Sequence, residues 1–223
     1  MELPHRDRLP APRLVLVLAG VTAVVSAVSI AVIDQPVARA IAPHEASSLW
    51  DRGINLLEYA IGLPVFKLLS AVLLVLAMIV TTFVSRLRIY APLFTLLAGT
   101  HLITRLAMIY LKEWTGRLRP HEWLELGGDT FLRDGGLSFP SGHVVLFASL
   151  VIPLVVVYQR LRPLLVIPVF VSAARIAVGA HFISDTTAAI ALVLLVTWGI
   201  AWVVRPCGPA PRRASPPGSA PLP

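Results

Sequence analysis

The chain has 223 residues, of which 57% are hydrophobic and only 14% are charged. Soluble domains are typically about 45–50% apolar and about 25% charged, so this composition excludes an ordinary soluble enzyme and, away from the ends, a disordered chain. The single cysteine, Cys207, excludes an intrachain disulfide framework and a cysteine-based metal site. The formal net charge of +7 does not indicate nucleic-acid binding, because the charged residues lie between long apolar runs instead of forming one basic face.

The apolar runs predict membrane-spanning helices, since roughly 20 helical residues cross the ~30 Å hydrocarbon core of a bilayer. The first run is too long for the core of a secretory signal peptide and no clean cleavage site follows it, so we expect a retained helix. Six spans are predicted: 14–33, 68–85, 89–111, 144–157, 164–180 and 186–204. His101 and Arg105 interrupt the third run and are expected to pair with polar partners inside the bundle. The sequence therefore predicts an all-α fold, a bundle of six transmembrane helices.

The distribution of basic residues predicts the orientation of these spans. Arginines precede the first span, follow the sixth, and lie between the second and third and between the fourth and fifth. They are Arg6, Arg8, Arg13, Arg86, Arg88, Arg160, Arg162, Arg205, Arg212 and Arg213. The positive-inside rule makes these loops and both termini cytoplasmic, in a multi-pass protein of the plasma or inner membrane. The segments 34–63, 112–142 and 181–185 then face outward.

This layout divides the chain into a cytoplasmic N-terminal segment at 1–12, a membrane domain at 13–204 and a tail at 205–223. The tail contains seven prolines with Gly and Ser, and we expect disorder because it cannot bury a core. The outward-facing stretch 45–61 has apolar and polar residues at helical spacing, with Glu58 on its polar side. It predicts an interfacial helix on the extracytoplasmic side, either a plain connector or a gate for a substrate.

Cations and histidines collect at the outward ends of the predicted spans, where a membrane protein retains charges only for a reason. They come from three separate stretches: Lys112, Arg117, Arg119, His121, His143, Arg175, His181 and Asp185. Arginine and lysine supply charge-assisted donors that match the oxygens of a phosphate. The stretch 140–143 precedes an apolar run, so it would add backbone N–H groups at a helix N-terminus. Together these features indicate a phosphate site.

Two histidines have the placement expected of reactive groups. His181 and Asp185 are four residues apart, so on a helix the carboxylate can accept a hydrogen bond and leave the other imidazole nitrogen free as a nucleophile or base. His143 comes from a different helix and can donate a proton. Metal binding is the competing use of these residues, but the neighbouring cations would repel a divalent ion. Arg117 and His121 are interpreted as loop residues beside the site.

The order and spacing of these residues resemble the three signature motifs of the type 2 phosphatidic acid phosphatase (PAP2) and haloperoxidase superfamily. The motifs read Lys112-x6-Arg119-Pro120, then Pro140-Ser141-Gly142-His143, then Arg175-x5-His181-x3-Asp185. They occupy 112–185, and the six-span layout is similar to that of the integral-membrane lipid phosphatases of this superfamily over about 10–205.

The resemblance implies a role for each motif residue. His181 would attack phosphorus and form a phosphohistidine, Asp185 would orient it, and His143 would protonate the leaving group and then activate water. The phosphoryl oxygens would be bound by Lys112, Arg119, Ser141, Gly142 and Arg175. In one departure from the family pattern, Ala174 stands where the third motif usually has serine, which removes a hydroxyl near the phosphate.

The predicted function is hydrolysis of a lipid phosphate or diphosphate without a metal or another cofactor, because fixed arginine and lysine donors can stabilise the charge of phosphoryl transfer. Polyprenyl diphosphate, phosphatidic acid and phosphatidylglycerophosphate all present a phosphate at the right depth. The alternatives are a phosphotransferase that uses an alcohol acceptor and a non-catalytic lipid-phosphate binder or carrier. The expected partners are the lipid substrate and membrane lipids, with no nucleic acid and no obligate protein partner.

Overall fold

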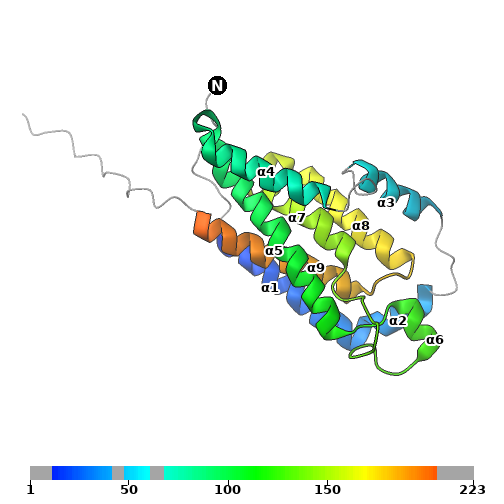
Figure 1. Cartoon of the computed structure of the whole chain (residues 1–223). Coiled ribbons are helices and arrows are strands. Elements are labelled where there is room, and N and C mark those ends of the chain that lie inside the picture. Colours follow the sequence, from blue (N-terminus) through cyan, green and yellow to red (C-terminus); the bar gives the residue numbers. More distant parts are fainter. Residues whose placement is uncertain (1–11, 42–47, 61–67, 205–223) are drawn as a thin grey trace, which may run out of the picture.

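The computed structural model describes residues 12–41, 48–60 and 68–204, and all the regular secondary structure in these ranges is helical. The elements are α1 (Pro12–Val28), the π-helical turn η1 (Ser29–Ile33), α2 (Asp34–Ile41), α3 (Ser48–Ala60), α4 (Leu69–Phe83), the 3-10 turn η2 (Ser85–Tyr90), α5 (Ala91–Thr115), α6 (Pro120–Leu126), α7 (Gly142–Val157), the 3-10 turn η3 (Gln159–Leu165), α8 (Val166–Ala177) and α9 (Ile183–Val204). The predicted all-α class is confirmed for this part of the chain (Figure 1). The predicted tail and all but the last residue of the N-terminal segment lie outside the described residues.

Apolar helices of membrane-spanning length support the assignment to a membrane. Within the described residues, three helical segments are long and apolar enough to cross a bilayer: Arg13–Ile41, Ser85–Leu126 and Ile183–Val204. Leu69–Phe83 and Gly142–Val157 are shorter apolar helices. The outer faces of α1 and α4 expose large apolar side chains, which in water would be unfavourable but in lipid are matched to their surroundings. These helices indicate a membrane protein.

The first helix continues beyond the predicted end of its span. The sequence predicts an end at residue 33, before the charge of Asp34, but the helix runs through η1 and α2 to Ile41. Asp34 is only 2% exposed, because an ion pair described below compensates its charge. A π-helical turn is uncommon in globular proteins and changes the face that the following residues present.

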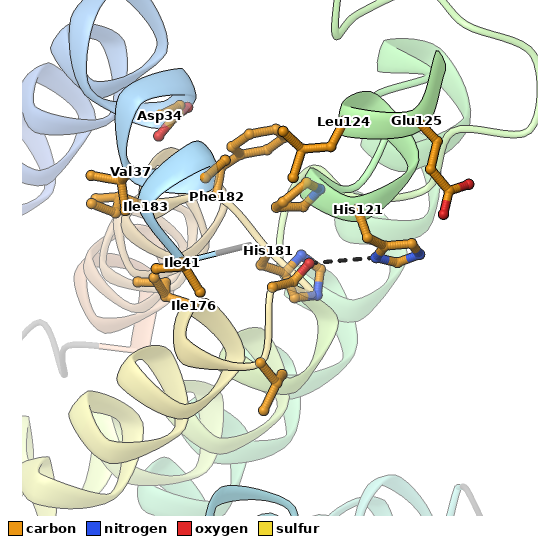
Figure 2. Close-up of a pocket in the computed structure, with 14 residues that line it drawn as sticks. Asp34, Val37, Ile41, His121, Leu124, Glu125, Ile176, His181, Phe182 and Ile183 are labelled. Carbon is orange, nitrogen blue, oxygen red and sulfur yellow. Dashed lines mark hydrogen bonds between the residues drawn. The ribbon is translucent and has the colours of Figure 1, made fainter. Parts of the chain in front are cut away.

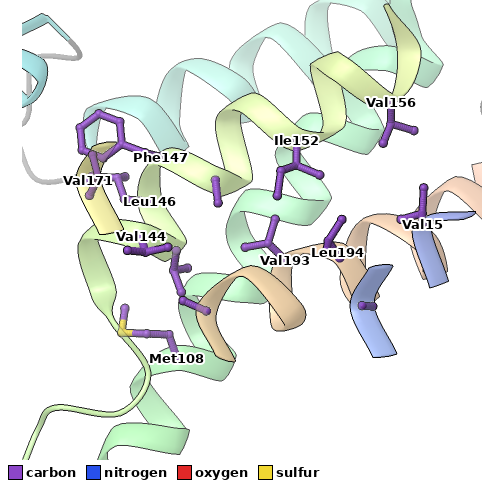
Figure 3. Packing of buried hydrophobic residues seen from close by; sticks show 14 residues of the cluster. Val15, Met108, Val144, Leu146, Phe147, Ile152, Val156, Val171, Val193 and Leu194 are labelled. Atoms are coloured by element: carbon purple, nitrogen blue, oxygen red, sulfur yellow. The ribbon is translucent and has the colours of Figure 1, made fainter. Parts of the chain in front are cut away.

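Helix α7 lies at the centre of the bundle. It contacts α5, α8 and α9, while α1 packs along α9 and α4 packs against α5. Ala98 of α5, Ala148 of α7 and Ala189 of α9 are fully buried, and such small side chains let helix backbones approach closely where lipid provides no hydrophobic drive for association. Figure 3 shows branched apolar side chains filling the space between α7 and α9.

One polar network crosses this apolar core. His101 is fully buried, with its Nδ1 2.8 Å from the Oγ of Ser149 and its Nε2 3.1 Å from the Oγ of Ser70. Both imidazole nitrogens therefore have partners, as the sequence led us to expect for His101, and the network connects α4, α5 and α7.

The chain direction places the three motif regions at the same end of the bundle. α5 ends at Thr115, α7 begins at Gly142 and α9 begins at Ile183, so the loops between them come together near α2 and α6. The turn η2 and the last residues of α9 lie at the opposite end (Figure 1). A helix, α3, is present within the stretch 45–61, and it packs against α8.

Candidate active site

The residues of the three motifs converge on this end of the bundle from four helices and the segments that connect them. Lys112 lies in the last turn of α5, Gly142 begins α7, Arg175 lies in the last turn of α8 and Asp185 lies in the first turn of α9. Arg119 and Ser141 are the residues directly before α6 and α7, and His181 lies between α8 and α9. Lys112 lies within electrostatic range of Arg119, Arg175 and Asp185, and His143 within that of Lys112 and Arg175. The fold therefore brings together residues that are separated by up to 73 positions in the sequence, 185 minus 112.

His181 forms the pair with Asp185 that its spacing predicts. Its Nδ1 lies 3.4 Å from Oδ2 of Asp185 and 3.3 Å from the Oγ of Ser138. The carboxylate oxygen also accepts hydrogen bonds from the Ser138 hydroxyl at 2.6 Å and the Phe182 N–H at 2.9 Å. The 3.4 Å separation exceeds that of an ordinary hydrogen bond, as is common in catalytic sites without substrate. Because Nδ1 faces the carboxylate, Nε2 is the nitrogen available for chemistry.

The surroundings of His181 favour its neutral form. Burial lowers the pKa of His181 from 6.5 to about 4. The hydrogen bond and the charge of Asp185 oppose this shift, and the charges of Lys112 and Arg175 add to it. The imidazole of the free protein is therefore unprotonated at neutral pH, and its lone pair can attack an electrophile.

The backbone holds Arg175 and His181 in a fixed relation. The carbonyl of Arg175 accepts hydrogen bonds from the N–H groups of Ala180 at 3.1 Å and His181 at 3.2 Å. Gly179 takes φ of +63° in this turn, a left-handed conformation that glycine adopts with little cost. Ala174, where the family pattern has serine, is fully buried and its carbonyl caps the same turn through the Val178 N–H at 3.0 Å.

Arg117 has a more central place than the sequence analysis gave it. Its side chain is 1% exposed, with Nη1 2.5 Å from Oδ1 of Asp185 and Nη2 2.7 Å from Oδ2 of Asp34. Nη1 also donates to the Ser184 hydroxyl at 2.5 Å. The guanidinium lies 4.3 Å from the ring centre of Phe182, a cation–π contact. Arg117 is thus a buried ion-pair centre that holds the carboxylate next to His181.

Asp34, the first residue of α2, completes this buried ionic cluster. Its Oδ1 accepts the Ser184 N–H at 3.1 Å, and its Oδ2 accepts the Ser184 hydroxyl as well as Arg117. The sequence analysis noted neither Asp34 nor Ser138 as a site residue. The available signal for Asp34 was an acidic residue directly after a long apolar run, a position that membrane proteins retain for a partner.

Some of the residues expected to bind phosphate have protein partners in this structure. Lys112 donates from its Nζ to the carbonyl of Leu137, and the Ser141 N–H donates to the carbonyl of Asp185 at 3.1 Å. The Oγ of Ser141 is buried and has no hydrogen-bond partner among the described residues. A Cβ on Gly142 would meet Met108 and Lys112 only at ordinary contact distances, so packing alone does not require glycine there.

His143 has an acidic partner that the sequence analysis missed. Its Nε2 lies 2.7 Å from Oε1 of Glu58 in α3, and the two side chains are 32% and 18% exposed. The sequence pattern places Glu58 on the polar side of an interfacial helix. In the structure it lies one turn after Ile54, which is 3% exposed, so it is on the side of α3 that packs against the bundle.

A cavity of about 400 Å³ adjoins His181 between α2, α6 and the α8–α9 turn. Its wall is mainly apolar, with Val37, Ile41, Leu124 and Ile176 among the lining residues (Figure 2). His121 is at its edge, exposed, with Nδ1 3.4 Å from the carbonyl of Gly179. His121 is therefore beside the cavity, but it lies in α6 and not in a loop as the sequence suggests. No three His, Cys, Asp or Glu side chains within the described ranges are grouped in a way that could hold a metal ion.

Comparison with known proteins establishes the family. The sequence model of the PAP2 superfamily matches residues 70–209, a stretch that contains all three motifs. The chain belongs to the PAP2 superfamily. Members of this superfamily are generally phosphatases, so a phosphate ester is the class of substrate that family membership supports. No curated protein and no solved structure matches the chain.

Proposed function

We propose that this chain is a membrane phosphatase that hydrolyses a lipid phosphate or diphosphate through a phosphohistidine on His181, without a metal ion. One observation carries the proposal. A neutral, buried His181 has its Nδ1 toward Asp185 and lies within electrostatic range of Lys112 and Arg175, at one end of a bundle of apolar helices. This arrangement joins a nucleophile to cations suited to phosphoryl oxygens.

In the first step, Nε2 of His181 attacks phosphorus, and the new P–N bond forms as the P–O bond to the leaving group breaks. Lys112, Arg119 and Arg175 stabilise the charge on the phosphoryl oxygens, and their proximity to one another supports this role. Lys112 would exchange the Leu137 carbonyl for a phosphoryl oxygen. Asp185 orients the imidazole through Nδ1 and stabilises the positive charge that the ring acquires.

In the second step, water attacks the phosphohistidine, the P–N bond breaks, and phosphate leaves. His143 serves both steps: it gives a proton to the leaving oxygen in the first and takes one from the attacking water in the second. Its place at the start of α7, within electrostatic range of Lys112 and Arg175, supports this role.

We propose further that the chain crosses the membrane six times, with both termini cytoplasmic and the site on the extracytoplasmic face of the plasma or inner membrane. Arg86 and Arg88 lie in η2 and Arg160 and Arg162 in η3, the turns that join helices away from the motif end of the bundle. The positive-inside rule favours this side for the cytoplasm. In that orientation α3 would lie at the extracytoplasmic surface of the plasma or inner membrane.

When a lipid phosphate binds at the extracytoplasmic end of the bundle, the hydrocarbon chains of the lipid can stay within the bilayer. We therefore take phosphatidic acid, phosphatidylglycerophosphate and polyprenyl diphosphate as the candidate substrates. The distinguishing experiment measures phosphate release from each by the purified full-length chain in mixed micelles, with and without EDTA. We expect at least one lipid to be hydrolysed at the same rate in EDTA, with inhibition by orthovanadate, which resembles the trigonal-bipyramidal transition state.

Each other outcome of that experiment identifies a different function. Loss of activity in EDTA that Mg²⁺ or Zn²⁺ restores would contradict metal-independent catalysis. Phosphorylated glycerol in place of free phosphate, when glycerol is added, would indicate a phosphotransferase. Saturable binding of these lipids with no product at all would indicate a binder or carrier. His181→Ala should abolish release in every case of hydrolysis, whereas Asp134→Asn, at an exposed loop position, should not change it.

A further inference from the structure

Helix α3 carries a carboxylate on the side that faces the protein. Trp50, Gly53, Ile54, Leu57 and Glu58 follow helical spacing, and Ile54 is 3% exposed. On the opposite side Leu56 is 72% exposed. An acidic group on the packing side of an amphipathic helix is costly unless it has a partner, and the partner here is the Nε2 of His143 at 2.7 Å.

Close packing determines where α3 holds this carboxylate. The rings of Trp50 and Phe170 have their centres 5.5 Å apart, and the same Phe170 ring packs over Gly53. A Cβ added to Gly53 would lie 2.6 Å from Cζ of Phe170, which is too close without displacement of the ring or of the helix. The absence of a side chain at Gly53 thus lets α3 approach α8 closely enough for Glu58 to contact His143.

We propose that Glu58 is a positioning residue that keeps His143 in its proton-donating form, so that α3 contributes to catalysis as well as connecting two spans. The inference rests on the proposed role of His143 as the acid. The charged groups whose fields reach His143 within the described chain are Lys112 of α5, Arg175 of α8 and Glu58 of α3. Burial and these two cations lower the pKa of His143, and the carboxylate of Glu58 opposes that lowering through its charge and its hydrogen bond.

The proton balance follows from this pairing. Glu58 stays ionised and accepts from Nε2 throughout, so the proton that moves is the one on Nδ1. In the first step that proton passes to the leaving oxygen as the P–O bond breaks, and His143 becomes neutral. In the second step Nδ1 takes a proton from water as its oxygen bonds to phosphorus and the P–N bond to His181 breaks, which restores the starting form.

The test compares two substrates that have the same lipid tail and differ in how much they need an acid. Farnesyl monophosphate must expel an alkoxide, whereas farnesyl diphosphate expels a phosphate ester that needs little protonation. Dioctanoylglycerol phosphate and diphosphate form the equivalent glycerolipid pair. For the pair that the wild-type chain hydrolyses, we expect Glu58→Gln to reduce kcat on the monophosphate by about 10- to 100-fold, a part of the about 10²–10⁴-fold that general acid catalysis contributes. On the diphosphate we expect a change of less than about threefold, since that step needs little of the acid contribution.

Glutamine keeps the shape and an acceptor oxygen, so Glu58→Gln removes only the charge. Asp134→Asn removes a charge from an exposed loop position and should leave both rates unchanged. In the His143→Ala background, Glu58→Gln should cause no further loss, because its effect passes through His143. Gly53→Val should reproduce the selective loss on the monophosphate by pushing α3 away from α8, and Phe170→Ala added to it should restore part of the rate.

The outcomes separate this inference from the proposed function. The readout for His143→Ala is the single-turnover rate of phosphoenzyme formation, because the loss of the base slows the second step for both substrates. If His143→Ala slows this first step selectively on the monophosphate and Glu58→Gln does not, the role of Glu58 is wrong while that of His143 as the acid stands. If His143→Ala slows the first step equally on both substrates, the assignment of His143 as the acid is wrong. If Glu58→Gln accelerates turnover or lowers KM on both substrates, the Glu58–His143 contact is inhibitory and the inference is overturned.

Discussion

Arg117 binds the side of the Asp185 carboxylate that faces away from His181: Nη1 of the arginine lies 2.5 Å from Oδ1, whereas Oδ2 is the oxygen near His181. The other guanidinium nitrogen pairs with Asp34 of the first helix at 2.7 Å. The residue that orients His181 is therefore part of a buried ionic cluster which also fixes α1 and α2 against the start of α9. A buried cluster of this kind stays favourable only while each charge keeps its partners.

We predict that Arg117→Leu lowers the free energy of unfolding by about 3–5 kcal/mol, because it leaves two buried carboxylates without their cation. Arg117→Lys should cost less, since the charge remains but one ammonium lacks the planar fork that contacts both carboxylates. Thermal unfolding in detergent micelles measures these changes. The matched control, Arg86→Leu, removes an exposed arginine from η2. Equal stability of Arg117→Leu and Arg86→Leu would contradict the role of the cluster.

The sequence predicted the helices and the reactive pair because both depend on local spacing. Long apolar runs predict helices in a bilayer whatever their neighbours are, and His181 and Asp185 are only four positions apart. Arg117 and Asp34 are 83 positions apart, so no periodicity in the sequence relates them. The π turn before Asp34 was equally beyond prediction, because the helix continues only where a distant arginine compensates the charge.

Glu58 shows a different limit of sequence analysis. Helical spacing alone puts Glu58 one turn after Ile54, on the side that packs against the core, but its charge suggests a solvent-exposed position. The physical reason for the error is that an exposed and a paired carboxylate look identical in a sequence. Only the position of His143 in space distinguishes them.

The low pKa of His181 predicts a pH-dependent stability. An unfolded histidine takes up a proton near pH 6.5, whereas the folded imidazole resists protonation until about pH 4. Between these values the unfolded state binds more protons, so stability falls as pH falls from about 6.5 to 4. The contribution is up to about 3 kcal/mol at 1.36 kcal/mol per pKa unit.

His181→Asn tests this contribution, because its amide can still donate to Asp185 but does not titrate. Chemical unfolding in micelles at pH 7.0, 5.5 and 4.5 should show a steeper loss of stability in the wild type than in the variant. Parallel curves for the two proteins would mean that His181 is not protected from protonation in the folded state.

The proposed topology predicts which end of the bundle is accessible from outside the cell. In a Cys207→Ser background, Asp129→Cys places a thiol in an exposed loop at the motif end, and Arg86→Cys places one in exposed η2 at the other end. An impermeant thiol reagent should label the first in intact cells and the second only after permeabilisation. The reverse pattern would put the site on the cytoplasmic side.

Phosphohistidine formation gives the most direct test of the mechanism. Under single-turnover conditions with ³²P-labelled lipid, rapid quenching should trap acid-labile, base-stable phosphate on the wild-type chain. His181→Ala should trap none, because the nucleophile is absent. His143→Ala should accumulate phosphoenzyme from a diphosphate, because the phosphate ester that it expels leaves without protonation. Hydrolysis of the intermediate should slow by about 10²–10⁴-fold for lack of a base.

Asp185→Asn should fall between these two variants. The amide can occupy the same place but can hold the imidazole in the wrong tautomer, with the proton on Nε2 instead of Nδ1, so the intermediate should form slowly yet remain detectable. Because Arg117 would also lose its ionic partner, the unfolding midpoint of this variant must be measured alongside and the rate compared below it. Phosphate trapped on His181→Ala, or none on the wild type while product forms, would instead indicate that water attacks phosphorus directly, with His181 as its general base.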